Sequence, residues 1–475
     1  MNKPPVFTVY FFIKSLKISF LSLTLALISG TGLVQANIVI SDIQAIDLGV
    51  LSGGSTSTAS DINDAGNIVG SSDTPSGETH AFYLPFGGVM TDISTLPGGD
   101  TSHANSINDL NQVVGSANFL NNDTGNLVFH GFEWQGGVIR DLGAYPPEDD
   151  IDSSSNAHAI NNNGLIGGNV DLAGVVWDLP GISNFPPFPP YVRVTDPGPF
   201  TPAIAYDINN AGQAAGSLLS ATTGFRWQAG VLETLVPLQA VDDDAYAINE
   251  LGEVVGRGAL APPVHYHAVF WPDPATVQDL GTLGGENSEA RDINNDRIIV
   301  GYSETATGDT EAFVWHADFG MQPLGTLGGV NSKAFGVNSD GQIVGESETV
   351  TGQVHATLWS VVYATKILVD IKPGNDQNPI NPRSKGKLTI AILTTEDFNA
   401  SEVDASTIRF GPGAAVPVWY GVKDVNHDRN WDLVLEINTQ EAGIACGDTE
   451  ATLKAQTLDG DQISGTDSIW TVECK

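Results

Sequence analysis

Near the C-terminal end of the chain, oxygen-bearing side chains occupy five alternate positions. They are Asp424, Asn426, Asp428, Asn430 and Asp432. Ligands at alternate positions let a curled loop surround a hard cation, and carboxylate and amide oxygens are the ligands that calcium prefers. We therefore predict that this loop binds Ca²⁺, which is the one cofactor that the sequence suggests.

Two residues depart from the usual calcium loop. The sixth position, where glycine permits a sharp turn, is Arg429, and its positive charge opposes the ion. The twelfth position is Leu435 in place of glutamate. The alternative is an Asp- and Asn-rich turn that has lost its ion.

No catalytic constellation stands out in the sequence. It has no Gly-x-Ser-x-Gly nucleophile elbow, no His-Glu-x-x-His zinc helix, no phosphate-binding glycine loop and no dinucleotide fingerprint. His80, His130, His267 and His355 recur at about the same place in successive repeats, so we interpret them as packing or hydrogen-bonding residues. Carboxylates are abundant, so a pair suited to glycoside hydrolysis stays open.

We interpret residues 1–36 as a signal peptide. Three lysines precede an apolar run, 18–34, which ends in the signal-peptidase pattern Val34-Gln35-Ala36. We expect cleavage after Ala36 and secretion to the extracellular space. We also expect no membrane insertion of the mature chain, because no later segment is long and apolar enough to cross a bilayer. The alternative is an uncleaved membrane anchor.

The mature chain is strongly acidic. Residues 1–36 hold three lysines and no acid, so the 20 basic side chains fall to 17 against 56 acidic ones, a net charge of about −39. Nucleic acid and anionic membranes are therefore poor partners, whereas cations and neutral polar ligands such as glycans fit better. The alternative is that the acidic side chains only keep the protein soluble.

Cys446 and Cys474 are the only cysteines in the chain. An isolated pair in an exported protein usually forms a disulfide, so we predict this bond. Closing a loop of about 29 residues would stabilise its domain by about 3 to 4 kcal/mol.

A repeat fills most of the chain. Seven times the sequence places Ala, then Asn four residues later, then Gly seven residues after that, with Ile or Val before the Asn. The seven asparagines, 40 to 53 residues apart, are Asn63, Asn108, Asn161, Asn209, Asn249, Asn294 and Asn338. This period is typical of the four-stranded blades of a β-propeller. We predict an all-β fold, a seven-bladed propeller of about 45-residue repeats over 37–364, with an open solenoid as the alternative.

Each copy contains four short strand patterns separated by Gly, Asn, Asp and Ser. In the sixth copy the predicted strands are 288–294, 298–303, 311–315 and 320–324. The N-terminal segment 45–49 matches a fourth strand, so it could complete the last blade and remove an exposed edge. The competing possibility is that 361–364 supplies that strand.

The repeats resemble the bacterial extracellular HAF repeats. The matching residues are His80-Ala81-Phe82, the Ile-Asn-x-x-Gly-x-Ile-Val-Gly core and Leu-Gly-Thr-Leu-Gly-Gly at 280–285 and 324–329. The resemblance implies an exported, propeller-like repeat protein with no established activity. Residues 365–475 resemble β-rich accessory modules of bacterial secreted proteins, and we expect a small β-sandwich-like domain there.

Connectivity locates a candidate binding face. In an up-and-down blade the loops after strands two and four share one end of the ring, and here they include the longer polar stretches 71–79, 117–128, 303–310 and 347–354. Variable loops on a rigid ring are where binding usually resides. We expect a non-enzymatic recognition or adhesion protein that binds a polar ligand, a glycan or a protein, through this loop face.

Two other functions stay open. One is a secreted polysaccharide hydrolase or lyase, which a cluster of carboxylates, histidine and tyrosine around the channel mouth would favour. The other is a purely structural component of an envelope or matrix.

Overall fold

The computed structural model describes residues 38–143, 152–178, 191–193, 202–220, 222–239, 242–260, 265–375 and 377–474. The predicted signal peptide lies outside these residues. The chain divides into two compact units. Asp42–Val361 is called the repeat unit here, and Val362–Lys475, which groups with Met1–Ser41, is called the C-terminal unit.

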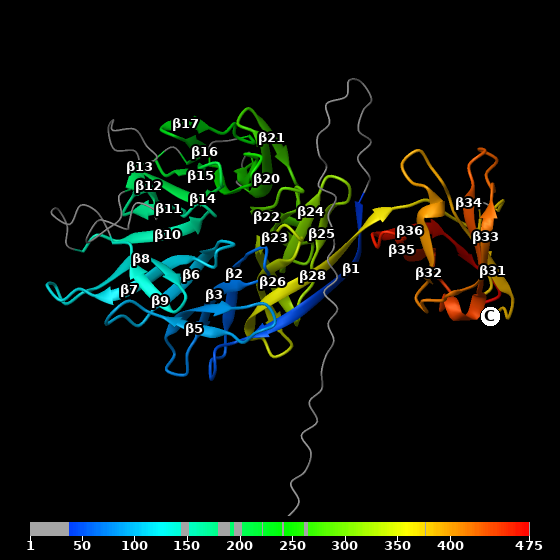
Figure 1. Cartoon of the computed structure of the whole chain (residues 1–475), viewed down its shortest axis with the longest axis horizontal. Helices are drawn as coiled ribbons and strands as arrows, with labels where there is room; N and C mark the ends of the chain where they lie inside the picture. Colours follow the sequence, from blue (N-terminus) through cyan, green and yellow to red (C-terminus); the bar gives the residue numbers. More distant parts are fainter. Residues whose placement is uncertain are drawn as a thin grey trace, which may run out of the picture. The chain divides into compact units, whose positions relative to one another are not determined.

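The repeat unit consists of antiparallel sheets that follow one another along the chain (Figure 1). Six sheets have four strands each, joined in chain order. The first two sheets are β2 (Ser57–Ile62), β3 (Ile68–Asp73), β4 (Thr79–Leu84) and β5 (Thr91–Ser94), followed by β6 (Ser102–Ile107), β7 (Val113–Leu120), β8 (Leu127–Gln135) and β9 (Val138–Asp141). The next two are β10 (Ser155–Ile160), β11 (Leu165–Val170), β12 (Ala173–Asp178) and β13 (Tyr191–Arg193), followed by β14 (Ala203–Ile208), β15 (Gln213–Leu218), β16 (Thr223–Gln228) and β17 (Val231–Thr234). The last two are β18 (Asp244–Ile248), β19 (Val254–Ala259), β20 (Tyr266–Asp273) and β21 (Thr276–Asp279), followed by β22 (Gly284–Ile293), β23 (Ile299–Thr305), β24 (Thr310–His316) and β25 (Gly320–Pro323).

One further sheet combines the two ends of the repeat unit. It contains β26 (Gly328–Val337), β27 (Ile343–Thr349) and β28 (Val354–Lys366), and β1 (Ile38–Gly49) pairs with β28. Asp47 of β1 bonds His355 at 3.0 Å, just as Asp279 bonds His267 at 2.8 Å within one copy. The N-terminal strand therefore takes the place of a fourth strand, and the competing segment 361–364 is part of β28 itself. The predicted all-β propeller fold is confirmed.

The seven repeated asparagines form a closed ring of hydrogen bonds. The Nδ2 of each asparagine donates to the backbone carbonyl oxygen of the asparagine in the next copy. The N–O distances, starting at Asn63 and continuing through the seventh copy back to the first, are 3.0, 3.0, 2.7, 2.9, 3.3, 3.0 and 3.1 Å. The last bond joins Asn338 to Asn63, 275 residues apart, and closes the circle.

The other side-chain atom of each asparagine fixes its own turn. In all seven copies Oδ1 accepts the backbone N–H four residues on, for example that of Leu165 at 2.9 Å from Asn161. All seven side chains are buried. A buried amide is costly unless both its oxygen and its nitrogen have hydrogen-bond partners. Here the oxygen bonds the turn within the copy and the nitrogen bonds the next sheet, so the same side chain stabilises both.

The repeated alanine and glycine allow the first two strands of each sheet to approach closely. A Cβ on Gly70 would lie 2.0 Å from the carbonyl oxygen of Thr58, and the equivalent distance is 1.8 to 2.1 Å in the other six copies. Only glycine fits at such a contact. The paired alanines, such as Ala59 opposite Gly70, are fully buried.

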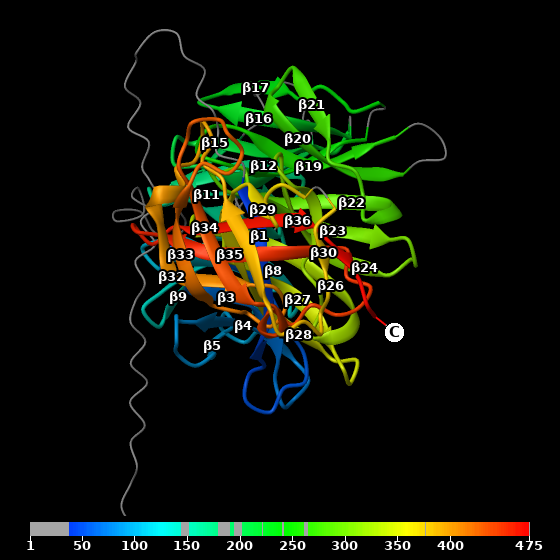
Figure 2. The same ribbon diagram turned by 90° about the vertical axis from the view of Figure 1, so that its right-hand side faces the viewer.

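The C-terminal unit has two sheets around one apolar core (Figure 2). One sheet contains β29 (Val369–Ile371), β31 (Lys387–Ile392), β34 (Asp432–Asn438) and β33 (Pro417–Lys423), and the other contains β32 (Val403–Phe410), β35 (Glu450–Thr457), β36 (Gln462–Ser468) and the end of β28. The pair β30 (Pro379–Ile380) and β37 (Trp470–Thr471) and the 3₁₀ helices η2 (Ala400–Glu402) and η3 (Thr439–Ala442) complete it. The disulfide Cys446–Cys474 is formed, with 5.7 Å between the Cα atoms. Among the described residues, no helix is long and apolar enough to cross a membrane.

We expect Asn161→Ala to lower the free energy of unfolding by about 3 kcal/mol, because it removes three hydrogen bonds: those from the backbone amides of Asn163 and Leu165, and one of the two that the carbonyl of Asn209 accepts. Denaturant unfolding of the mature protein measures this loss. The matched control is Asn163→Ala, which removes one exposed bond to the carbonyl of Asn210 and should cost about 1 kcal/mol or less. Equal losses in the two variants would contradict the role given to the asparagine ring.

Candidate functional site

The first strand of every sheet in the repeat unit carries a β-bulge at the same place. In the first copy Ala59 pairs with Gly70 and Asp61 pairs with Val69, so the residue between them is extra, and the register shifts in the same way in the other six copies. A bulge re-aims its side chain. The bulge residues, called axial residues here, are Ser60, Asn105, His158, Tyr206, Tyr246, Arg291 and Phe335.

All seven axial residues line one cavity of about 340 Å³. It is called the channel cavity here, and its lining also contains Thr58, Ser106, Ala159, Asp207 and Ala247, together with Asp61 and Asp292. Each first strand starts at the loop end of its sheet and finishes at the asparagine turn. The cavity therefore lies on the loop side of the asparagine ring, which is the side predicted to bind a ligand.

Aromatic rings and one guanidinium shape the cavity wall. The ring centroids of His158 and Tyr206 are 5.5 Å apart, and those of Tyr206 and Tyr246 are 5.4 Å apart, both pairs edge to face. The guanidinium of Arg291 lies over the ring of Tyr246, 4.3 Å from its centroid. These contacts hold the side chains in place, together with the hydrogen bonds of His158 to Asn169 and of Tyr246 to Asp244.

Three carboxylates in the cavity connect neighbouring sheets. Each accepts the backbone N–H of the following residue at 2.7 Å through Oδ1. Through Oδ2 each accepts a backbone N–H from the next sheet: Asp61 from Ile107 at 2.9 Å, Asp207 from Ile248 at 2.8 Å and Asp292 from Val337 at 2.7 Å.

Burial controls the protonation of the cavity. It raises the pKa of Asp61 to about 7 and that of Asp207 to about 6, and the backbone hydrogen bonds oppose the rise. It also raises the pKa of Asp292 well above the usual value, with Asp61 and Asp207 adding repulsion. For His158, burial lowers the pKa to about 4. Near neutral pH the imidazole is therefore uncharged, and the carboxyl groups of Asp61 and Asp207 titrate within reach of physiological conditions.

A second hollow, of about 290 Å³, lies at the asparagine turns. Its lining includes the acidic residues Asp64, Asp109 and Glu250. Their oxygens accept backbone N–H groups of neighbouring copies, from Ser339, Asp64 and Asn210 respectively. These carboxylates therefore join adjacent turns, as the asparagines do.

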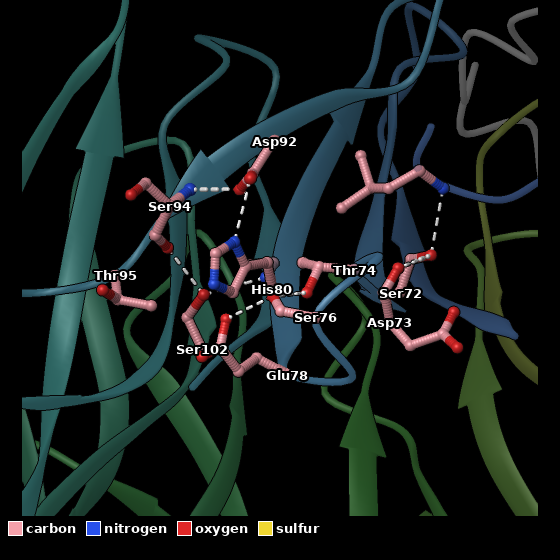
Figure 3. Close-up of polar contacts among 12 residues, drawn as sticks. Ser72, Asp73, Thr74, Ser76, Glu78, His80, Asp92, Ser94, Thr95 and Ser102 are labelled. Atoms are coloured by element: carbon pink, nitrogen blue, oxygen red, sulfur yellow. Dashed lines mark hydrogen bonds and ion pairs between the residues drawn. The ribbon is translucent and has the colours of Figure 1, made fainter. Parts of the chain in front are cut away.

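The loop after the second strand is a tight, hydrogen-bonded turn in three copies. In the first copy Thr74 donates its backbone N–H to the carbonyl of Glu78, and the hydroxyl of Ser76 donates to the Glu78 carboxylate at 2.8 Å (Figure 3). The sixth and seventh copies form the same turn at 305–309 and 349–353.

The repeated histidines are hydrogen-bonding residues, as interpreted from the sequence. His80 bonds Asp92 of the fourth strand at 2.8 Å, and the backbone N–H of Ser94 donates to the same carboxylate (Figure 3). His130, His267 and His355 have equivalent aspartate partners. Their places on outer strands of the sheets separate them from the channel cavity.

The predicted calcium loop connects β33 to β34 in the C-terminal unit. Arg429 has φ +77°, the left-handed conformation that glycine usually provides at this position. Its backbone N–H donates to Oδ2 of Asp424 at 3.1 Å, while Oδ1 of Asp424 is buried without a hydrogen-bond partner. Asn426, Asp428 and Asn430 are exposed and bonded to one another. The backbone and the orphaned Asp424 oxygen fit a calcium ion.

Asp432 differs from the other four predicted ligands. It is fully buried, and its two oxygens accept the backbone N–H groups of Thr394 at 3.0 Å and Val425 at 2.9 Å. This residue therefore anchors the loop to the sheet. Across the described ranges, no group of three or more His, Cys, Asp or Glu side chains is placed to hold a metal ion. Calcium binding stays a prediction.

Comparisons with known proteins give similarity in fold only. No protein-family model and no curated protein matches the chain, so the resemblance to HAF repeats stays a prediction. Similar solved structures include the extracellular domain of a hybrid two component system from B. thetaiotaomicron, at 12% identity and TM-score 0.39, covering 74% of this chain and 46% of that one. This chain thus spans about half the length of that match.

Two enzymes are also among the similar structures. They are a gluconolactonase from Xanthomonas campestris (9% identity, TM-score 0.32, 68% of this chain and 90% of that one) and virginiamycin B lyase from Staphylococcus aureus (9%, 0.30, 67% and 98%). At these identities and scores, neither carries an argument about activity.

The raised pKa values predict a pH effect on stability. A carboxyl whose pKa is higher in the folded protein than the unfolded value of 3.8 stabilises the fold fully below that value, and this stabilisation is lost as the pH rises through the folded pKa. We expect wild type to lose about 2 kcal/mol relative to Asp61→Asn between pH 5 and pH 8, because the asparagine does not titrate. Denaturant unfolding at both pH values measures this difference. A constant difference would show that Asp61 titrates normally.

The calcium prediction has its own test in the mature protein. Added calcium should raise the melting temperature, because a ligand that binds only the folded state stabilises it by mass action. Asp428→Ala should abolish that increase and change the calcium-free melting temperature little, whereas Asp432→Ala should lower the calcium-free value, since it removes two buried hydrogen bonds. An unchanged wild-type melting temperature at millimolar calcium would leave the loop as an acidic turn.

Proposed function

We propose that the protein is an extracellular, non-enzymatic recognition protein whose repeat unit binds a polar ligand, a glycan, in the channel cavity from the loop face. The disulfide Cys446–Cys474 and the expected signal peptide support an extracellular location. The strongly acidic composition supports a ligand that is not a nucleic acid.

The observation that carries the proposal is the contrast between positions in the repeat. Ala, Ile or Val, Asn and Gly recur in every copy because each has a packing or hydrogen-bonding task in the scaffold. The axial position is Ser, Asn, His, Tyr, Tyr, Arg or Phe in the seven copies, although its backbone conformation is the same bulge each time. A scaffold does not require this variety, whereas an asymmetric ligand does.

The chemistry of the axial residues suits a saccharide. Small-ligand sites combine aromatic surface with a few placed polar groups, and sugar rings have both apolar faces and hydroxyl edges. Tyr206, Tyr246 and Phe335 supply the aromatic surface. The hydroxyl of Ser60 and the amide oxygen of Asn105, whose amide nitrogen already donates to Asn156 and Ala157, supply hydrogen-bonding groups in the same cavity.

A secreted hydrolase or lyase is the second candidate, because carboxylates, a histidine and tyrosines meet in one cavity. Its difficulty is that both oxygens of Asp61, Asp207 and Asp292 already accept backbone N–H groups, as a bridging residue would. A general acid or base must exchange its proton with substrate, so these carboxylates would have to leave their partners first. Recognition needs no such step.

The test is a glycan array probed with the purified mature protein and three variants. We expect wild type to bind a defined set of glycans, Tyr206→Ala to lose that binding and Tyr206→Phe to retain most of it, with near-equal melting temperatures as the check on folding. The control is Trp419→Ala, which removes a 52% exposed ring from β33 of the C-terminal unit.

Loss of binding in Trp419→Ala with retention in Tyr206→Ala would overturn the proposal and move recognition to the C-terminal unit. Release of reducing ends or unsaturated products from the bound glycans would establish the enzyme instead.

A further inference from the structure

Arg291 has hydrogen-bond donors to spare. Its side chain is 33% exposed, and among the described residues its guanidinium makes no hydrogen bond. Its nearest ionic partner is Oε2 of Glu289, at 3.8 Å from Nη1. That distance is too long for a hydrogen bond. The guanidinium nevertheless has a defined place, because it is stacked on Tyr246.

Four other arginines of the repeat unit have a closer acceptor, the most distant being Glu133 at 3.4 Å from Arg140. Arg257 bonds Asp244 and Glu289, each within 3.0 Å. Arg297 is bidentate to Glu253 at 2.8 and 3.0 Å, and Arg226 bonds Glu233 and the carbonyl of Gly252. Since arginines of this fold ordinarily find acceptors, the open donors of Arg291 need a specific explanation.

The neighbouring Glu289 cannot readily supply the missing acceptor. Its Oε1 accepts from Arg257 at 3.0 Å, and its Oε2 accepts the hydroxyl of Tyr302 at 2.6 Å. These bonds hold the carboxylate away from Arg291. The five N–H groups of Arg291 are therefore offered to the channel cavity, in the planar fork that matches a carboxylate.

We infer that the glycan bound in the channel cavity is acidic, and that the guanidinium of Arg291 pairs with the carboxylate of a uronic acid unit. This inference rests on the proposed function and names its ligand class. Stacking on Tyr246 orients the guanidinium in advance, so little side-chain entropy is lost on binding. The carboxylates of the cavity and the net negative charge of the protein oppose an acidic ligand, so a preference for the acid requires the pairing with Arg291 to outweigh this repulsion.

Protonation inside the cavity should modulate this binding. Charged and titratable groups surround Arg291 on its own strand and on the strands next to it. They are Asp292 and Glu289 on β22, Asp244 and Tyr246 on β18, Arg257 on β19, Tyr302 on β23 and Lys333 on β26. Elsewhere in the cavity the titratable groups are Asp61, His158, Tyr206 and Asp207. Of these, Asp61 and Asp207 have pKa values of about 7 and 6 and lose negative charge as the pH falls. An anion should therefore bind more tightly at pH 6 than at pH 8.

The test measures saccharide binding to the full mature protein by titration calorimetry. The probes are oligogalacturonate, its methyl ester, which keeps the sugar rings but carries no charge, and a sulfated oligosaccharide. We expect oligogalacturonate to bind about tenfold or more tightly than its ester, since a hydrogen bond to a charged group contributes that much. Arg291→Gln should erase the difference, and Arg291→Lys should restore part of it.

The control is Arg226→Gln, which removes one positive charge from the repeat unit away from the cavity lining and should leave the preference intact. Equal affinity for acid and ester, or equal effects of the Arg226 and Arg291 variants, would overturn the inference. A preference for the sulfated probe would also overturn it, in favour of a sulfate ester. The proposed function fails separately, if no saccharide binds or if Tyr206→Ala leaves binding unchanged.

Discussion

The buried amide of an asparagine side chain is the group on which the whole repeat unit depends. Each amide has one acceptor and two donor hydrogens, and the fold uses them in two directions at once. Oδ1 fixes the turn within a copy, and Nδ2 reaches the carbonyl of the next copy. Aspartate would lose the donor, and glutamine would place both groups one carbon too far away.

The asparagine bonds also fix the positions of the residues that precede each turn, because they hold every turn close to the next one. The bulge that aims the axial side chains lies three residues before each asparagine, so the geometry of the channel cavity is set by bonds that do not touch a ligand.

Much of this architecture could be predicted from the sequence because its causes are repeated. The Ala, Asn and Gly positions perform the same tasks in every copy, so their spacing revealed the sheets and the role of the N-terminal strand. The channel cavity could not be predicted in the same way. The axial residues that line it differ from copy to copy, so a search for repeated residues does not find them. The sequence does contain one indication of the cavity: the axial position varies from copy to copy, while the Ala, Asn and Gly positions of the repeat do not. The bulge is likewise invisible in the pattern, because one extra residue in a strand does not disturb a period of about 45.

The calcium loop shows a different limit of sequence reasoning. The five alternating oxygen ligands are equivalent in the sequence pattern. In the structure, Asp432 is buried and accepts the backbone N–H groups of Thr394 and Val425, while Asn426 and Asp428 are exposed. Which oxygens are free depends on the sheet behind the loop. Conversely, Arg429 looked unfavourable by residue type, although its backbone adopts the conformation that the loop requires. Side-chain identity alone therefore shows neither which oxygens are already bonded within the fold nor which backbone conformation the loop adopts.

The pairing of β1 with β28 has a kinetic consequence for a protein made from one end to the other. Six sheets can form from strands that are adjacent in the chain, but the remaining sheet needs residues about 300 positions apart. Contacts between such distant segments are slow to form, because a long loop must be closed first. Until the last copy has been synthesised, β1 has no partner, and an unpaired strand is a site of aggregation. The predicted cleavage point lies just before β1, so the same short segment would be released from the export machinery and then complete the ring. Closure of the ring would thus wait until the whole repeat unit has emerged.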